Sequence, residues 1–149
     1  MKLKQKCAVI TGGANGIGRA VAELFVAEGA RIAILDCDRR NGEAAAAALN
    51  GRALFLPCDV SDSRQADEAL QTAVSHLGTI DILINDAASQ LNKPLLETSD
   101  EEFRKVLDIN LTATFHFTRE AAKLMIAHRH PGVIVNFSST FAFVGSPGY

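Results

Sequence analysis

The sequence predicts an α/β fold in which a doubly wound parallel β-sheet carries helices on both faces. Five short apolar runs lack polar alternation, which is typical of strands that are covered on both sides. Longer stretches with a helical period separate these runs. Glycine or polar residues follow every run, so a ligand site is expected at the carboxyl edge of the sheet.

The expected strands are short apolar segments. They cover residues 7–10, 32–35, 53–56, 80–84 and 133–135. Because helices alternate with them, right-handed crossovers should join them into a single parallel sheet. We expect the strand order 3-2-1-4-5, counted along the chain, which places the ligand crevice between the first and fourth strands.

The first three helices are expected in the gaps between these strands. The first ends before Gly29, the second ends at Asn50 and Gly51, and the third covers about residues 62–77 and ends at Gly78. Glycine suits these ends because it adopts left-handed backbone angles without strain. The first helix is indicated by an apolar repeat with the helical period: Ile17, Ala20, Val21, Leu24 and Phe25.

A longer fourth helix is expected to begin at a capping box, Ser99 to Glu102, and to continue to about His128. Asn110 stands on or beside its inward stripe, where a carboxamide needs hydrogen-bond partners. Two interpretations remain open: Asn110 is a structural bridge at a kink, or it organises water near a reacting group. The stripe consists of Phe103, Val106, Leu107, Leu111 and Thr114.

Composition excludes several classes of protein. The 149 residues fit a single domain, and 48% hydrophobic content is enough for a core. A net charge of −2 disfavours a nucleic-acid partner, and no run reaches membrane-spanning or signal-peptide length, so we expect a cytoplasmic protein. The three cysteines, Cys7, Cys37 and Cys58, are expected to be reduced, and His128 and His130 to lie at a solvated helix end without a metal.

A glycine-rich segment, Thr11–Gly18, joins the first strand to the first helix with the pattern T-G-x-x-x-G-x-G. Gly12 permits a tight turn, Gly16 allows a pyrophosphate to approach the backbone, and Gly18 lets the helix pack closely on the sheet. A nucleoside-triphosphatase loop is rejected because Arg19 and Ala20 replace the required Lys and Ser/Thr. A plain glycine turn is the alternative, but the position between a strand and an amphipathic helix favours dinucleotide binding.

Asp36 ends the second strand, eighteen residues after Gly18. A carboxylate there can accept hydrogen bonds from both hydroxyls of an adenosine ribose and would repel the 2′-phosphate of NADP. Arg39 and Arg40 follow closely and are the groups that could instead reach a phosphate. The sequence therefore favours NAD over NADP.

Together these residues resemble the short-chain dehydrogenase/reductase family, and the resemblance extends over the whole chain. The segments that match its motifs are Thr11–Gly18, Asp59-Val60, Asn85-Asp86-Ala87-Ala88, Asp108-Ile109-Asn110-Leu111 and the strand that ends in Ser138-Ser139. The resemblance implies a Rossmann-like fold and hydride transfer between a nicotinamide and a secondary alcohol or ketone.

The same resemblance implies roles for individual residues. Ser139 would position the substrate oxygen, and Asn110 would hold a water on the proton path. NAD would be bound by residues that follow several strands: Gly12, Asn15, Gly16, Ile17, Gly18, Asp36, Asp59, Val60, Asn85 and Ala87. A small alcohol or ketone is the expected partner, without a metal.

Several positions depart from the family pattern. Asp86 and Ala88 replace an asparagine and a glycine, and Phe141 lies where alanine is usual. The family's Y-x-x-x-K motif would fall beyond residue 149, so Tyr149 is interpreted as a neighbour of the catalytic tyrosine. We therefore expect a single domain, 1–149, that lacks the C-terminal part of the fold.

Two hypotheses follow for this chain. In the first, it is the cofactor-binding half of an oxidoreductase and lacks the catalytic Tyr and Lys. In the second, it is a non-catalytic NAD-binding or interaction module. Under either hypothesis, the fifth strand would expose apolar surface at an edge of the sheet, so a homo-oligomer is expected.

Overall fold

A computed structural model describes residues 1–144 and confirms the predicted α/β architecture. All strands are parallel and form one sheet in the order β3-β2-β1-β4-β5. The fourth strand begins two residues later than predicted, because Ile80 lies in a loop and Asp81 in a bend that precede it. The strands are β1 Cys7–Thr11, β2 Arg31–Asp36, β3 Ala53–Pro57, β4 Ile82–Asn85 and β5 Val133–Asn136.

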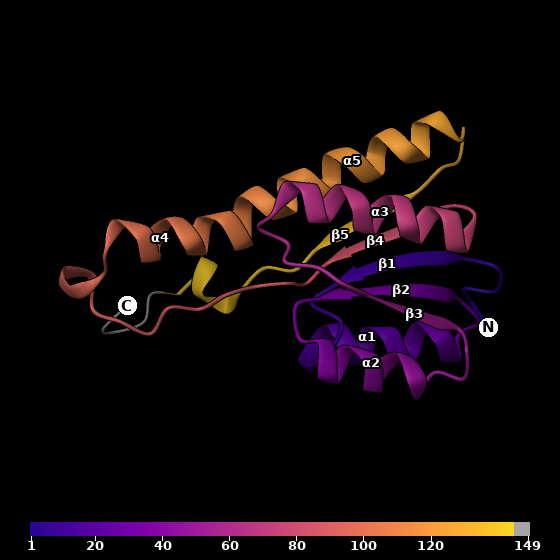
Figure 1. Cartoon of the computed structure of the whole chain (residues 1–149), viewed down its shortest axis with the longest axis horizontal. Helices are drawn as coiled ribbons and strands as arrows, with labels where there is room; N and C mark the ends of the chain where they lie inside the picture. Colours follow the sequence, from indigo (N-terminus) through magenta and orange to yellow (C-terminus); the bar gives the residue numbers. More distant parts are fainter. Residues whose placement is uncertain (145–149) are drawn as a thin grey trace.

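Helices cover both faces of this sheet, as predicted. Figure 1 shows α1 and α2 on one face and α3 and α5 on the other, while α4 extends beyond the carboxyl ends of the strands. The helices are α1 Gly16–Ala27, α2 Arg39–Ala47, α3 Ser63–Leu77, α4 Asp100–Leu107 and α5 Ala113–Ala127. Within residues 1–144, no helix combines the length and the apolar character needed to cross a bilayer.

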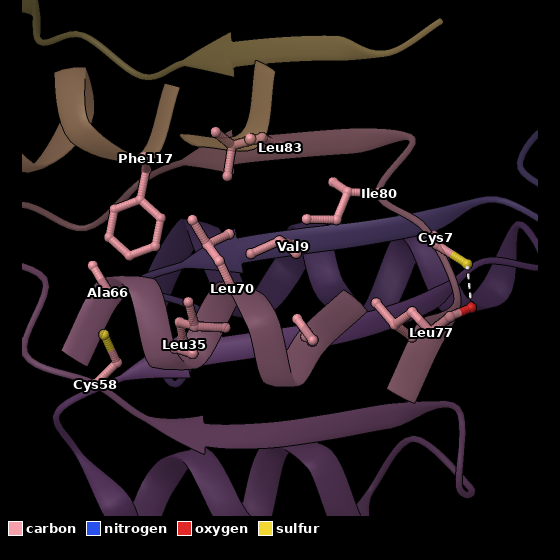
Figure 2. Packing of buried hydrophobic residues seen from close by; sticks show 14 of the residues in the cluster. Cys7, Val9, Leu35, Cys58, Ala66, Leu70, Leu77, Ile80, Leu83 and Phe117 are labelled. Atoms are coloured by element: carbon pink, nitrogen blue, oxygen red, sulfur yellow. Dashed lines mark hydrogen bonds between the residues drawn. The ribbon is translucent and has the colours of Figure 1, made fainter. Parts of the chain in front are cut away.

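The main hydrophobic core lies between the sheet and the pair of helices α3 and α5. Figure 2 shows Phe117 of α5 and Leu70 of α3 directed toward Val9, Leu35 and Leu83 of the central strands. All five side chains are almost fully buried. This packing fixes the strands whose carboxyl ends carry the polar residues of the site.

The first helix packs only part of its predicted apolar repeat against the core, namely Val21 and Phe25. Ile17 and Leu24 are each 59% exposed, and the buried residues of α1 are Gly18 and Ala22. The cause is the close approach of the helix to the sheet, because a β-carbon on Gly18 would lie 2.4 Å from the Gly12 carbonyl oxygen. Small residues therefore face the sheet, and Ile17 is turned toward the carboxyl edge.

The long helical stretch after Ser99 has the predicted extent, but a π-helical turn, η2 (Asp108–Thr112), interrupts it between α4 and α5. Its expected inward stripe is also wrong, since Phe103 is 57% exposed and Leu111 is 64% exposed. The physical reason is the position of α4, which projects past the sheet and so has no strand beneath it (Figure 1).

At the amino ends of the strands, the buried carboxylate of Asp81 links several segments of the chain. It accepts hydrogen bonds from Lys6 Nζ at 2.8 Å and from the Cys7 amide at 2.8 Å. His130 Nε2 lies 2.6 Å from the same carboxylate, which corrects the prediction that His130 belongs to a merely solvated helix end. A buried charge favours such partners because it has lost its water.

Candidate functional site

The glycine loop has the backbone that its sequence predicts. Gly12 has φ +71°, and a β-carbon there would lie 2.8 Å from the Ala87 backbone, so only glycine fits between β1 and the loop after β4. Gly16 has φ +53° and open space within 4 Å of its β-carbon position. The first turn of α1 is therefore accessible to a ligand from outside.

Asp36 connects the end of β2 to this loop. Its Oδ2 accepts a hydrogen bond from the Ala14 amide at 3.0 Å, and its Oδ1 accepts one from the Asp38 amide at 2.9 Å. Asn15 Nδ2 donates to Asp38 at 3.2 Å, which joins the loop to the first turn of α2. The carboxylate thus lies beside the glycine loop, as the sequence predicted.

A first cavity of about 310 Å³ opens next to Asp36. It brings together Gly12, Asn15 and Asp36 with Asp59 and Val60, which follow β3. Asp59 Oδ1 is held by the amide of Ser61 at 3.0 Å and by its hydroxyl at 2.7 Å. This cavity therefore combines the carboxylates of Asp36 and Asp59 with apolar residues such as Val60 and Ile109.

Two thiols were not predicted to lie in this cavity. Cys37 and Cys58 both line it, although sequence reasoning gave the cysteines only a structural role. Burial is the main cause, and the nearby Asp59 carboxylate the next, that together raise the pKa of the Cys58 thiol to about 12. In the sequence, Cys37 directly follows Asp36 and Cys58 directly precedes Asp59. This adjacency to predicted site residues is the signal from which the position of both thiols could have been predicted.

The ends of β4 and β5 are joined by a carboxamide network. Asn85 is buried, and its Nδ2 donates to Asn136 Oδ1 at 2.8 Å and to Thr118 Oγ1 at 3.2 Å. Its Oδ1 is also buried and has no hydrogen-bond partner among residues 1–144. The network ties the two strands together below Ser138 and Ser139.

Asp86, the residue that departs from the family pattern, lies against the start of α1. Burial raises the pKa of Asp86, and a hydrogen bond from the Gly18 amide opposes that rise without cancelling it. The carboxylate therefore occupies one of the free amides that a helix N-terminus offers to an anionic ligand.

Asn110 projects from the π turn and holds the segment that follows β4. Its Oδ1 accepts from the Ser89 amide at 2.7 Å, and its Nδ2 donates to the Ser89 carbonyl at 2.8 Å. The sequence left two interpretations of Asn110 open, and these hydrogen bonds correspond to the first, a structural bridge. The role in organising water stays a prediction. π turns of this kind occur frequently at functional sites.

Three cavities lie in a row along the carboxyl edge of the sheet. A central cavity of about 570 Å³ contains Asn15, Gly16 and Ile17 on one side and Ser138 and Ser139 on the other. It shares its Asp86-Ala87-Ala88 wall with the first cavity. It also shares Ala88, Asn110 and Ser139 with an outer cavity of about 610 Å³.

The row brings the predicted site residues together. Gly18 lies beneath it in the start of α1, and the other predicted residues line at least one of the three cavities. Ser139 stands where the central and outer cavities meet, and its Oγ accepts a hydrogen bond from the Phe141 amide at 3.2 Å. Tyr149 lies outside the described residues.

Comparison with known proteins identifies the family to which this chain belongs. A family model described as short chain dehydrogenase matches residues 6–149. The chain is 38% identical over 146 residues to the 2,5-dichloro-2,5-cyclohexadiene-1,4-diol dehydrogenase of Sphingobium indicum, and the match covers 97% of this chain and 58% of that protein.

Two crystal structures share its fold closely. One is NAD⁺-bound xylitol dehydrogenase, with a TM-score of 0.92 and 32% identity over 99% of this chain and 58% of the other. The second is the 3-ketoacyl-(acyl-carrier-protein) reductase of Brucella melitensis in complex with NADH, with a TM-score of 0.91 and 29% identity over 98% of this chain and 62% of the other. This chain therefore spans about three fifths of the length of these proteins.

Proposed function

Because this chain belongs to the short-chain dehydrogenase family, we propose that it binds NAD(H) for the oxidation of a secondary alcohol or the reduction of the matching ketone. The bound nicotinamide would accept or supply the hydride. The chain's own residues would hold the dinucleotide along the cavity row and fix the substrate oxygen at its outer end.

The observation that carries this proposal is that the glycine loop, Asp36 and Ser139 line three adjacent cavities that share wall residues. Adenosine would occupy the first cavity, with its ribose hydroxyls donating to the free lone pairs of Asp36. The pyrophosphate would rest on the first turn of α1, where Gly16 leaves open space. The nicotinamide would then lie in the central cavity, beside Ser139.

Ser139 is suited to hold a substrate oxygen. Its Oγ accepts from the Phe141 amide, so its own hydroxyl hydrogen is available to donate. Such a donor stabilises the negative charge that develops on a carbonyl oxygen during hydride addition. Solved relatives carrying NADH and NAD⁺ support the choice of cofactor.

Titration of the chain with NADH and NADPH, followed by nucleotide fluorescence, tests the proposal. NADH should bind more tightly than NADPH, because Asp36 repels a 2′-phosphate. Asp36→Ser should reduce this preference about tenfold or more, while Asp67→Asn on α3 should leave it unchanged. Failure of folded protein to bind either nucleotide would refute the proposal.

A panel of secondary alcohols incubated with NAD⁺ then separates the two hypotheses for this chain. NADH formation would support the oxidoreductase. Nucleotide binding without any turnover would favour the non-catalytic module, since loss of a general acid or base lowers rates by about 10²–10⁴.

A further inference from the structure

The residues that line the outer cavity indicate which kind of substrate it can bind. It lies between the segment after β4, the inner side of α4 and the residues that follow Ser139. Its apolar walls come from Leu91, Leu95, Phe103, Val106 and Phe141. At about 610 Å³ it falls in the size range of small-molecule sites, which are mostly apolar with a few polar groups that fix orientation.

Several polar side chains on this lining already have partners within the protein. Asn110 uses both ends of its carboxamide on the Ser89 backbone. The Thr98 hydroxyl donates to the Pro94 carbonyl at 3.1 Å. Besides Lys93 and Ser139, the remaining polar side chains on the lining are Ser89 and Gln90, too few to replace the water that a substrate with several hydroxyl groups would lose.

Lys93, the cation that the described residues contribute to this lining, is also neutralised. Lys93 Nζ lies 2.9 Å from each carboxylate oxygen of Glu102. Glu102 is held in turn by the capping box of α4, through the Ser99 amide at 2.9 Å. The ammonium is thus directed at Glu102, and an anionic substrate would have to compete with a fixed carboxylate.

At the inner end of the cavity lies Ser139, whose Oγ accepts from the Phe141 amide, so that its hydroxyl hydrogen can donate to a ligand oxygen. We infer that the outer cavity takes an uncharged, mainly apolar secondary alcohol or ketone, with its reacting oxygen at Ser139 and the rest of the molecule against Phe103 and Val106. This inference rests on the proposed function and narrows its substrate class, because it disfavours polyols and carboxylates.

Three ligands with the same six-membered ring test this selectivity: cyclohexanol, myo-inositol and 4-hydroxycyclohexanecarboxylate. Their binding to the 149-residue chain is measured by saturation-transfer NMR in the presence of saturating NADH. Cyclohexanol should bind at least tenfold more tightly than either of the others. Equal or tighter binding of myo-inositol or of the carboxylate would overturn the inference.

Substitution of Glu102 supplies a gain-of-binding test. Glu102→Gln keeps a residue type that completes a capping box but removes the charge that neutralises Lys93. The variant should bind 4-hydroxycyclohexanecarboxylate about fivefold or more tightly than the unmodified chain, with cyclohexanol unchanged. Glu101→Gln, in the same turn of α4, is the matched control and should have no effect.

A substitution in the apolar wall tests where cyclohexanol binds. Phe103 is 57% exposed, so Phe103→Gln should preserve the fold while weakening cyclohexanol several-fold. Unchanged cyclohexanol affinity in this variant would overturn the placement. NADH titration of every sample separates the two proposals: loss of NADH binding refutes the proposed function, whereas a reversed ligand order with NADH binding intact refutes only the substrate class.

Discussion

At the scale of single residues, Asp86 carries a charge that its surroundings disfavour. It is partly buried beside the first turn of α1, and burial raises its pKa despite the hydrogen bond from Gly18. An ionised carboxylate there would repel a pyrophosphate and would also occupy an amide that the pyrophosphate could use. The residue is therefore expected to weaken nucleotide binding.

We predict that Asp86→Asn tightens NADH binding about three- to tenfold at pH 7, because a close negative charge is removed. Affinity of the unmodified chain should rise as the pH falls toward the raised pKa of Asp86, and the variant should lack this component. Fluorescence titration at several pH values measures both effects, with Asp67→Asn as the control. Identical affinities and pH profiles for the variant and the unmodified chain would contradict the role given to Asp86.

The same substitution has a consequence for stability. A raised pKa in the folded protein means that the ionised form of Asp86 is destabilising, so its cost grows as the pH rises above the ordinary value of 3.8 and is complete above the raised pKa. The Asn variant should therefore be at least as stable as the unmodified chain at pH 7. Urea unfolding at pH 7 checks this sign.

At the scale of secondary-structure elements, the π turn between α4 and α5 positions Asn110 so that its side chain binds the Ser89 backbone. The bridge has a donor and an acceptor on each partner, so it holds both the position and the orientation of the segment after β4. That segment forms a wall of all three cavities through Ala88.

Asn110→Ala should release this segment without unfolding the protein. We predict that backbone hydrogen exchange of Ser89 and its neighbours becomes about tenfold faster, whereas the global free energy of unfolding changes by only about 1 kcal/mol, since the side chain is exposed. Thr112→Ala in the same π turn provides a control. Unaltered exchange at Ser89 would show that other contacts hold the segment.

Local sequence patterns predicted the strands because strands covered on both faces have a simple signature. They also predicted the Asp36 position and the capping box at Ser99, which depend on neighbours a few residues apart. The π turn was not predictable in this way, since one additional residue in a helical turn leaves the apolar spacing nearly intact. Exposure of Phe103 likewise depends on whether a strand lies beneath α4, which is a property of the tertiary structure.

At the scale of the whole molecule, Asp81 joins parts of the chain that are distant in sequence. Its carboxylate binds Lys6, the Cys7 amide and His130, and its backbone binds both Cys7 and Val133. Burial raises the pKa of Asp81, but hydrogen bonds from Lys6, His130 and the Cys7 amide outweigh it and leave the pKa below its ordinary value. The ionised form is therefore stabilising.

We predict that Asp81→Asn lowers the free energy of unfolding by about 1–3 kcal/mol at pH 7. Because the folded pKa is lowered, this contribution is present above the ordinary value of 3.8 and is lost as the pH falls through the folded value. The difference between the variant and the unmodified chain should shrink accordingly in acid. Urea unfolding across this range measures it, and a difference that persists at low pH would contradict the linkage.

The outer edge of the sheet leads to a prediction about assembly. β5 pairs with β4 on one side, and within residues 1–144 no strand pairs with its other side. Val133 and Val135 are 58% and 40% exposed, and Phe137, which follows them, is 44% exposed. An uncovered apolar edge strand favours contact with a second copy of the chain, so sedimentation velocity should detect association that increases with concentration.

Val135→Lys places a charge on this edge and should shift the protein toward monomer. As a control, Ile126→Lys adds the same charge to a 76% exposed site on α5 and should not shift it. A monomer at high concentration, or equal effects of the two lysines, would show that β5 does not drive assembly.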